Sequence, residues 1–573
     1  MSEEIKPVLL NGYAAKQCPV VVQNNYSPLV PTLDRIPTVE ETARLQAGRD
    51  FEAGVFDELA AIHPDSVTVD PRLRKVEAIA LTVEAMESQV PLIIGGFLPD
   101  DIAGARTGKP DILIWVGSGY VPADVKNHKT VEPAKKTSTQ VSRLKTPGER
   151  VEILGLKVSS SHRYKDGMQL AHYTRMLQAS GFHPGPDSLV AAVLGTSRLA
   201  VMPDAETTFA FVWHDLGEPR EFTFSRSRGK VRRSLLERYD HEHGFRVKVA
   251  TNALQIVGAA DDPHPLVEPV GQLDCRTCAY EQWCADQLGP DDPSTAINVG
   301  GLSRREWLAL RRMGIASTAA LSAVDPDDPD FLDEYYPEVT QLTRREASAR
   351  LTKAIVRAQM ICDGIEIARD GDGPLVVPEA DVEIDIDIEN DADNRVYMWG
   401  ARLRAGSNEA TAIYVADFVD WQPLTDESER QLAARFAVWL RAQRESAATA
   451  GHSVKVFHWT QLERTKLVSL LGMAAVGDLV DPEIGVFVDL AKVFNAQFIA
   501  LHGSRLKNVA PQFGFTWRVP DPGGAISQTY LSKVRSGADP DEVEAARQWL
   551  LSYNEDDNAA MAAIRDGMRR WTP

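Results

Sequence analysis

The sequence predicts an α/β protein of several domains, and three observations support this prediction. The chain has 573 residues, more than one ordinary hydrophobic core can organise, so two to four domains are expected. Strand-like and helical segments alternate again after the polar tract RDGDGP at 369–374. Four of the five cysteines fall at the two ends of the first half: Cys18, Cys275, Cys278 and Cys284. The expected parts are a metal-binding α/β unit, a small helical connector and a second α/β domain, over 1–290, 297–368 and 375–573.

The composition is that of a globular protein, with 44% hydrophobic and 25% charged residues. We find no run of the roughly 20 apolar residues that a membrane-spanning helix needs. The first ten residues, MSEEIKPVLL, carry acid where a signal peptide would carry base. We therefore expect a cytoplasmic protein that does not associate with membranes.

The charge is negative overall but unevenly distributed. A formal net charge of −19 argues against a protein that coats nucleic acid unselectively. Residues 125–165 nevertheless contain ten Lys or Arg against three Glu, and residues 220–248 contain nine Lys or Arg against four acidic residues. These basic stretches could follow a phosphate backbone. A solvated surface balanced by acid elsewhere explains them as well, and the sequence leaves both interpretations open.

The cysteines predict a soft-metal site that joins the two ends of residues 1–290. Thiolates spaced C-x2-C-x5-C in DCRTCAYEQWC can face one centre, and a few clustered cysteines in so long a chain are more typical of metal ligands than of a disulfide framework. A fourth thiolate at Cys18 would close the loop around the whole segment, and metal binding would offset the loop entropy. Iron–sulfur clusters and zinc both take thiolates, so the spacing does not decide between them.

A short helical module is expected between the two larger parts. LSRREWLALRRMGIASTAALSAV has helical periodicity that is interrupted at Gly314. This pattern is similar to a helix–hairpin–helix element, whose turn amides can hold a phosphate. A plain helical linker is the alternative interpretation.

Two acids and a lysine in the first half suggest a hard-metal site. Asp111 follows GKP, and Asp124-Val125-Lys126 follows a hairpin-like turn, so that Asp124 and Lys126 share one strand face. Carboxylates of this kind hold the divalent cation that phosphodiester hydrolysis needs, and Lys126 would orient the water or stabilise developing charge. Glu52, on an expected helix in GRDFEAGVFDEL, could add a ligand. Two further candidates lie four residues apart on one helical face in QLAHY: Gln169 and Tyr173.

A second group of acids follows the same logic near the C-terminus. Asp387-Ile388-Glu389 places two carboxylates on one strand face, and Tyr553 and Asp557 lie one turn apart in a segment that we expect to open a helix. Four acids around two cations would permit two-metal exonucleolysis. The candidates for the remaining acid are Glu463 and Asp489.

The ordered set of motifs in the first half resembles the RecB-type branch of the PD-(D/E)XK nuclease superfamily. Its parts are C18, GRDFE ending at Glu52, GKPD ending at Asp111, DVK from Asp124 to Lys126, Q-x3-Y from Gln169 to Tyr173 and the three clustered cysteines. The pattern is similar to the iron–sulfur members, such as CRISPR-associated RecB-like exonucleases and the AddB subunit of bacterial recombination nucleases. The resemblance implies a restriction-endonuclease-like core with a structural [4Fe–4S] cluster on the four cysteines. Glu52 departs from the pattern, because many relatives carry His there.

The second half resembles the RNase H-like, DEDD-type exonuclease domain that accompanies RecB-like nucleases in one bacterial family. The Asp-x-Glu of that domain maps onto Asp387 and Glu389, and its Tyr-x3-Asp onto Tyr553 and Asp557. Lys507, in RLKNVAPQFGF, fits the same pattern. The middle acid departs from it, because a standard second motif presents Asp after Asn and an aromatic residue. A degenerate domain that only binds nucleic acid is therefore the alternative.

These features predict a metal-dependent DNA nuclease that uses Mg²⁺ or Mn²⁺, expected to degrade single-stranded ends in DNA repair or recombination. Two alternatives stay open: a repair adaptor that binds nucleic acid and has lost catalysis, and an exonuclease directed at RNA, since two-metal chemistry need not involve the 2′-hydroxyl. In GARTGKP, Pro110 replaces the Ser or Thr of a nucleotide-binding loop and the spacing is one residue short. No ATPase is predicted, and a separate helicase is the candidate partner.

Overall fold

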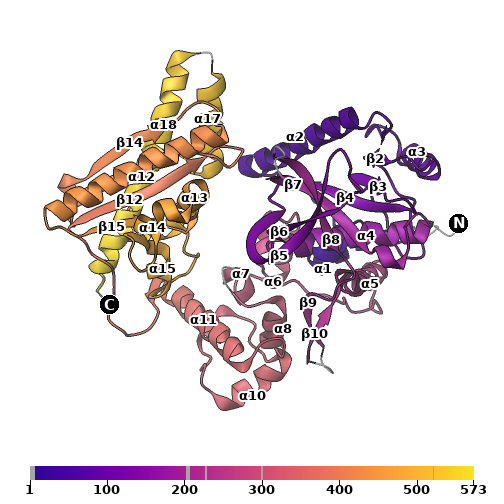
Figure 1. Ribbon diagram of the computed structural model, residues 1–573. Coiled ribbons are helices and arrows are strands. Elements are labelled where there is room, and N and C mark those ends of the chain that lie inside the picture. Colours follow the sequence, from indigo (N-terminus) through magenta and orange to yellow (C-terminus); the bar gives the residue numbers. More distant parts are fainter. Residues whose placement is uncertain are drawn as a thin grey trace. The chain divides into compact units, whose positions relative to one another are not determined.

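The computed structural model describes residues 7–572 apart from 202–206, 226–228, 298–300, 521 and 538. The chain forms two compact units, which are described separately (Figure 1). Unit 1 comprises residues up to 270 together with 274–288 and 336–344, and unit 2 comprises 271–273, 289–335 and 345–573. The predicted α/β architecture with several sheets is confirmed.

Unit 1 is built on an eight-stranded mixed sheet. In spatial order its strands are β1 (Val67–Thr68), β2 (Leu92–Ile94), β3 (Ile112–Trp115), β4 (Tyr120–Lys126), β7 (Val190–Leu199), β8 (Thr208–Asp215), β5 (Val131–Arg143) and β6 (Val151–Val158). A separate ribbon pairs β9 (Glu221–Ser225) with β10 (Gly229–Arg233). The α-helices of this unit are α1 (Pro19–Tyr26), α2 (Val39–Ile62), α3 (Lys75–Glu87), α4 (Arg163–Ser180), α5 (Leu235–Ala253) and α6 (Glu281–Leu288). Short 3-10 helices cover Ala14–Lys16, Pro186–Ser188 and Leu273–Thr277.

The centre of this sheet lies between helices, so both of its faces are buried. The ILI run of β3 has no exposed surface, and β3 pairs antiparallel with β4, which pairs parallel with β7. Such continuous apolar runs are typical of strands that are covered on both sides. Helix α4 packs against β4 and β7, and α2 packs against β4. The ends of β3 and β4 are thereby held next to α4.

The helices between the α/β parts are α7 (Pro293–Ala296), α8 (Arg304–Arg312), α9 (Thr318–Ser322), α10 (Pro329–Glu338) and α11 (Arg344–Asp363). Gly314 separates α8 from α9 with a φ of +84°, a conformation that favours glycine, so the interruption at this residue is observed. Buried Glu306 on α8 accepts two hydrogen bonds from Arg350 on α11, Nε at 2.9 Å and Nη2 at 2.8 Å. This bidentate pair fixes α8 against α11.

The second sheet has five strands in the order β14 (Ile413–Val419), β13 (Val396–Ala405), β12 (Val382–Asn390), β15 (Val454–His458) and β16 (Phe487–Asp489). The first three are antiparallel, and β15 and β16 run parallel to β12. Its helices are α12 (Asp426–Thr449), α13 (Leu462–Leu471), α14 (Met473–Val480), α15 (Leu490–Asn495), α16 (Leu506–Val509), α17 (Gly524–Ser536) and α18 (Pro540–Arg569). Short 3-10 helices cover Glu409–Thr411 and Ala510–Phe513, and β11 (Ile367–Arg369) pairs with β17 (Phe498–Ala500).

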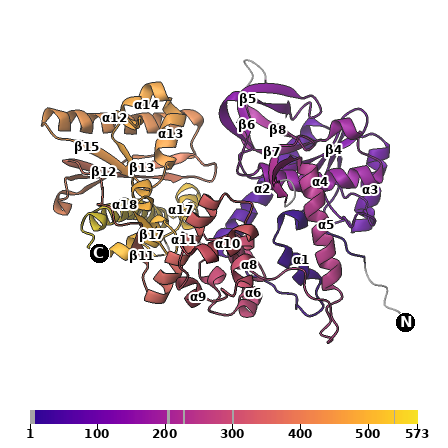
Figure 2. The same cartoon turned by 90° about the horizontal axis from the view of Figure 1, so that it is seen from below.

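Strand β12 separates two different layers. Ile384, Ile386 and Ile388 belong to the apolar core that includes α12 residues, whereas the acids at the alternate positions face α18. Figure 2 shows α12 and α18 on opposite sides of this sheet. The two-residue period of a strand therefore places every acid of VEIDIDIEN on the α18 side.

Ion pairs attach α18 to this acidic face. Arg565 and Arg404 are fully buried, and Nη2 of each lies near Glu383 Oε2, at 3.1 and 2.8 Å. Arg565 also pairs with Asp385, and Arg569 Nη2 donates to Glu383 Oε1 at 2.6 Å. We refer to these five residues as the buried charge network.

One expectation about α18 is wrong. Tyr553 and Asp557 do not open a helix but lie in its middle, because α18 already begins at Pro540. The start is set by Asp539, which accepts a hydrogen bond from the Asp541 amide, and by Pro540 in the first helical turn.

In the part of the chain that the structure describes, no helix combines the length and the apolar character needed to cross a membrane.

Candidate metal centres

The first group of predicted residues meets at the adjoining ends of β3 and β4 in unit 1. Lys126 Nζ lies 3.0 Å from Asp124 Oδ2 and 3.9 Å from Asp111 Oδ2. Asp111 Oδ2 also accepts a hydrogen bond from the Val125 amide at 2.7 Å. The two acids and the lysine are therefore in one site, as the strand spacing suggested.

The carboxylates of this site are poorly compensated. Burial and the charge of Asp124 raise the pKa of Asp111 to about 7, and the charge of Glu52 on α2 acts in the same direction. Asp124 is fully buried, and among the described residues its ion-pair partner is Lys126, which it shares with Asp111. A divalent cation would provide the missing positive charge, so the donor set fits a hard metal ion.

Gln169 and Tyr173 line the α4 side of the same site, where Gln169 Nε2 donates to the Tyr173 hydroxyl at 3.1 Å. Lys16, which the sequence analysis did not select, donates from Nζ to Gln169 Oε1 at 2.6 Å. Burial and the charge of Lys126 lower the pKa of Lys16 to about 8. The only sequence signal for Lys16 is its position two residues before Cys18.

The four predicted cysteine ligands lie near enough for their charges to influence one another. Burial raises the pKa of Cys284 to about 11, and negative charge on Cys278, Cys18 and Cys275 acts in the same direction. Segments 19–26 and 273–288 are in contact, because Tyr280 donates to Asn25 Oδ1 at 2.6 Å and Asn24 Nδ2 lies 3.9 Å from Cys284 Sγ. Four thiols in one neighbourhood are a donor set that fits a soft metal or an iron–sulfur cluster.

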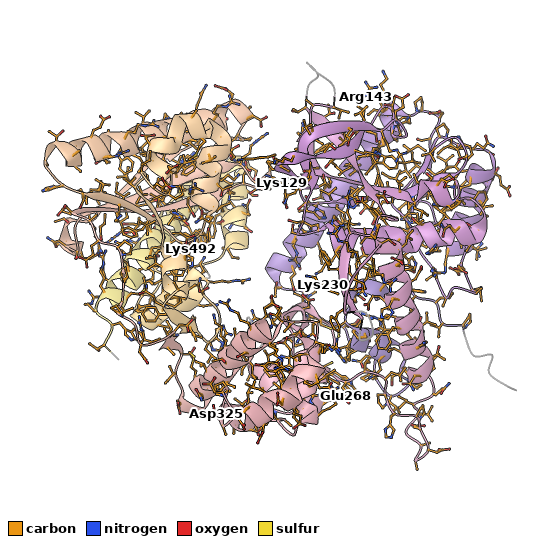
Figure 3. The ribbon with its side chains drawn as sticks, turned by 60° about the horizontal axis from the view of Figure 1, so that its bottom comes forward. Lys129, Arg143, Lys230, Glu268, Asp325 and Lys492 are labelled. Atoms are coloured by element: carbon orange, nitrogen blue, oxygen red, sulfur yellow. The ribbon has the colours of Figure 1, made fainter. Side chains whose placement is uncertain are left out.

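The basic stretches extend over several elements of unit 1, from the end of β4 to the start of α4 and from β9 to α5. Lys129, Arg143 and Lys230 lie apart from one another within unit 1 (Figure 3). Some of the basic side chains are paired, as Lys157 is with Glu132 at 3.1 Å. Both interpretations of these stretches therefore stay open.

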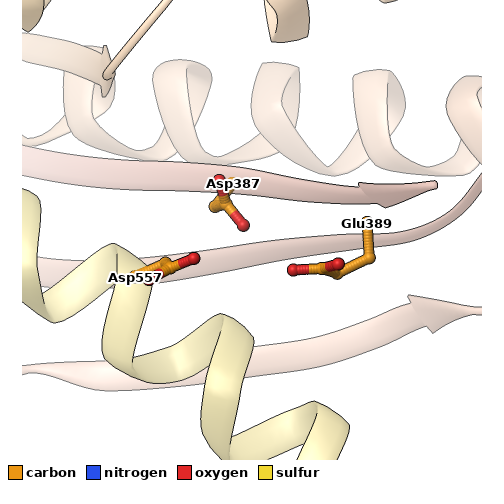
Figure 4. Close-up of side chains that lie close together, drawn as sticks. All are labelled: Asp387, Glu389 and Asp557. Carbon is orange, nitrogen blue, oxygen red and sulfur yellow. The ribbon is translucent and has the colours of Figure 1, made fainter. Parts of the chain in front are cut away.

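The second group of predicted residues meets between β12 and α18 in unit 2. Asp387 and Glu389 project from the strand toward Asp557 on the helix (Figure 4). One ligand oxygen from each of these carboxyl groups lies within 4.8 Å of the others. They line a pocket of about 250 Å³ that also includes Tyr553 and Ser527.

This region matches a known family. Residues 385–569 match the family model of the RNase_H superfamily. They form an RNase H-like domain. No curated protein and no solved structure matches the chain. Members of the superfamily are phosphodiesterase nucleases that use divalent metals such as Mg²⁺, so the RNase H-like domain indicates a metal-dependent nuclease-type function.

In the RNase H-like domain, Asp387, Glu389 and Asp557 lie close together with too little nearby positive charge to balance three ionised carboxylates. Burial and the charge of Asp557 raise the pKa of Glu389 to about 8, and the same two causes raise the pKa of Asp387 well above its usual value. Burial also raises the pKa of Asp557, although Lys507 opposes this. Oxygen donors in this state fit divalent cations.

Several neighbours orient these acids, and they come from distant parts of the chain. Trp517 Nε1 donates to Asp557 Oδ1 at 2.6 Å, Asn554 Nδ2 to Asp387 Oδ2 at 2.9 Å and Ser527 Oγ to Glu389 Oε2 at 3.2 Å. Lys507 Nζ donates to the Tyr553 hydroxyl and lies 3.8 Å from Asp557 Oδ2. The sequence analysis selected Tyr553 and noted Lys507 but missed the other three, of which only Asn554 stands beside a recognisable motif.

The two candidates for the remaining acid differ in their surroundings. Glu463 on α13 is buried, its Oε2 lacks a hydrogen-bond partner among the described residues, and burial raises its pKa to about 8. Its charge also raises the pKa of Asp387. Both oxygens of Asp489 are occupied, because Oδ1 accepts from the Lys492 amide at 2.8 Å and Oδ2 from Gln461 at 2.6 Å. Asp489 caps α15, so Glu463 is the candidate whose carboxylate stays available, and it lies outside the close group of Asp387, Glu389 and Asp557.

These pKa shifts predict how metal binding depends on pH. With folded pKa values near 8 for Glu389 and Glu463, above their unfolded values near 4.3, the folded protein binds more protons between these limits. The free energy of unfolding without metal should therefore fall as pH rises from about 4.5 to 8, by at most about 1.4 kcal/mol per pH unit and group. A bound cation should oppose this loss, so Mn²⁺ should raise the melting temperature more at pH 8 than at pH 5. Calorimetry with Mn²⁺ or EDTA at both pH values measures this, and an equal Mn²⁺ effect at both would contradict it.

Proposed function

We propose that the protein is a DNA nuclease with two metal-dependent sites, which degrades single-stranded ends in DNA repair or recombination. The observation that carries the proposal is the meeting of Asp387, Glu389 and Asp557 inside an RNase H-like domain. The first site, at Asp111, Asp124 and Lys126, adds a RecB-like PD-(D/E)XK centre. DNA is the proposed substrate because the motif order of the first half resembles that of DNA-end nucleases.

In the RNase H-like domain, Asp387, Glu389, Glu463 and Asp557 would hold Mg²⁺ or Mn²⁺. Bound there, the metal would polarise the phosphoryl group and activate water. Trp517 and Asn554 fix the carboxylate rotamers, and this orients the ligand oxygens. Lys507 donates a hydrogen bond to the Tyr553 hydroxyl, and Tyr553 lines the pocket, where its hydroxyl would contact the substrate phosphate.

In unit 1, Asp111 and Asp124 would hold the cation, and Glu52 would add a ligand. The charges of Asp124 and Asp111 raise the pKa of Lys126, which keeps it protonated. An ammonium group in this position can stabilise the charge that develops on the phosphoryl oxygens. Gln169 and Tyr173 would provide further polar atoms from α4.

The four cysteines would hold a [4Fe–4S] cluster with a structural role. Bound there, the cluster would cross-link the chain around Cys18 to the chain around Cys284, on either side of the sheet segment that carries the first site. The cysteine side chains lie outside the two acidic groups, so the chemistry of cleavage is assigned to the carboxylates.

Asp124→Asn tests the first site, in a chain that already carries Asp387→Asn so that the second site does not contribute. Removal of a metal ligand should cost several kcal/mol of transition-state stabilisation, which corresponds to a loss of about a thousandfold in cleavage rate. End-labelled single-stranded DNA with Mn²⁺ gives the rate, and circular DNA and RNA of the same sequence report end dependence and sugar preference.

Asp187→Asn in the same background is the matched control, because Asp187 is an exposed acid in the 3-10 helix Pro186–Ser188. The control should cleave normally. The melting temperature of the Asp124→Asn protein should fall far less than its cleavage rate, because Lys126 loses one ion-pair partner but keeps Asp111. Equal loss of activity and melting temperature would mean that Asp124 is structural.

A further inference from the structure

Lys16 reaches the first candidate site from the N-terminal segment of unit 1. Its Nζ donates to Gln169 Oε1 at 2.6 Å and lies 4.4 Å from the centre of the Tyr13 ring. Gln169 in turn donates to Tyr173, so Lys16 extends a chain of polar groups on the α4 side of the site. The residue lies on a different element from Asp111, Asp124 and Lys126.

The segment that carries Lys16 is held firmly in place. The Leu10 amide donates to Ala105 and the Thr107 amide donates to Leu10, each at 3.0 Å. At Gly12 an added Cβ would lie only 3.3 Å from Gln169 Cγ and from the Tyr173 hydroxyl, so the backbone passes close to α4. Arg246 Nη2 on α5 donates to the Gln17 carbonyl at 2.9 Å. Contacts on both sides of Lys16 therefore fix the direction from which it enters the site.

The ammonium group of Lys16 has no close ion-pair partner among the described residues, although the charges of Asp124 and Asp166 favour its protonated form. Among the residues that the structure describes, Lys16 forms no ion pair within 4.0 Å, whereas Lys126 pairs with both Asp124 and Asp111. One hydrogen-bond acceptor, Gln169 Oε1, faces its three N–H donors. A half-buried cation without an anionic partner is costly to retain unless a ligand provides the anion.

Lys16 and Lys126 belong to the same electrostatic environment. The charge of Lys126 opposes protonation of Lys16, and the charge of Asp124 favours it, so all three groups interact. Lys126 is already engaged by the carboxylates that would hold the metal. Lys16 therefore provides donors that are available to a substrate.

We propose that Lys16, beside Lys126, forms a phosphate-binding subsite that holds the backbone of a single nucleic-acid strand at the first metal centre. This inference rests on the proposed function and extends it to a residue outside the family motifs. Lysine suits the task because it acts as a compact point charge with three rotatable donors.

Lys16→Ala tests the subsite through binding rather than cleavage. The full chain is titrated with a fluorescent single-stranded oligonucleotide in Ca²⁺, and the dissociation constant is measured over a range of salt concentrations. Loss of one phosphate contact should make the negative slope of log association constant against log salt concentration shallower by about 0.7 and weaken binding about tenfold. Lys16→Arg should restore most of the affinity.

Lys75→Ala is the matched control, since Lys75 is exposed on α3, lies outside both basic stretches and its loss changes the net charge equally. Equal slopes for Lys16→Ala and Lys75→Ala would overturn the subsite. If Lys16→Ala melts at a lower temperature, Lys16→Met keeps the aliphatic stem, and unchanged binding by that variant would also overturn it. The proposed function fails separately, if Asp124→Asn in the Asp387→Asn background leaves cleavage intact.

Discussion

Replacing Asp387 by asparagine, in a chain that already carries Lys126→Ala, is expected to lower the rate of the remaining 3′–5′ degradation about a thousandfold or more. Asp387 shares a metal site with Glu389 and Asp557, and loss of one ligand forfeits several kcal/mol of transition-state stabilisation. The measurement is product length on 3′- and 5′-labelled single strands, with Mg²⁺ and with Mn²⁺. The two changes should be nearly additive in stability, because they lie in different units.

Asp393→Asn in the same Lys126→Ala background is the control, because Asp393 is an exposed acid just beyond β12. The control should keep its residual activity. A Lys126→Ala protein that cleaves neither DNA nor RNA would instead favour the degenerate interpretation, in which residues 379–570 serve in substrate binding. The unusual middle motif around Glu463 would then be the reason.

Cys275→Ser is expected to destabilise unit 1 by at least about 3 kcal/mol and to lower its melting temperature by about 10 °C, because metal-site binding energy is folding energy when the site joins distant segments. Anaerobically purified protein should be brown and contain about four irons per chain, one for each cysteine ligand of a cubane cluster. Metal analysis, visible absorbance and calorimetry measure the three quantities.

Cys362→Ser is the corresponding control, since Cys362 is exposed on α11. It should leave metal content and melting temperature unchanged. Stoichiometric zinc without visible absorbance would replace the iron assignment and keep the metal site. Identical metal content and melting temperature in the two variants would exclude Cys275 as a ligand.

Local sequence patterns predicted the elements that carry the acidic residues. Asp387 and Glu389 are two apart, and a strand places such residues on one face whatever its surroundings. Gln169 and Tyr173 are four apart, and a helix makes them neighbours. The mixed α/β character followed from the same patterns, because periodicity is a property of the local backbone.

Contacts between distant segments could not be predicted in this way. Lys16 meets Gln169 across 153 positions and Trp517 meets Asp557 across 40, and no local pattern encodes either contact. The choice between Glu463 and Asp489 likewise depended on tertiary structure, since Asp489 is used as a helix cap. The early start of α18 was missed because its signal, Asp539-Pro540, lies well before the acidic motif.

The buried charge network fixes the position of α18 along β12. An apolar interface allows a helix to shift along a strand, because one aliphatic contact can replace another. Proteins in which apolar residues replace a buried ion pair are often as stable as the original. A slip of one helical turn would move Asp557 by about 5.4 Å, more than the 4.8 Å that spans the three ligand oxygens. Arg565 and Arg569 meet Glu383 and Asp385 in one alignment only. A redesigned apolar interior could therefore preserve the fold of this domain and still lose the alignment of its carboxylates.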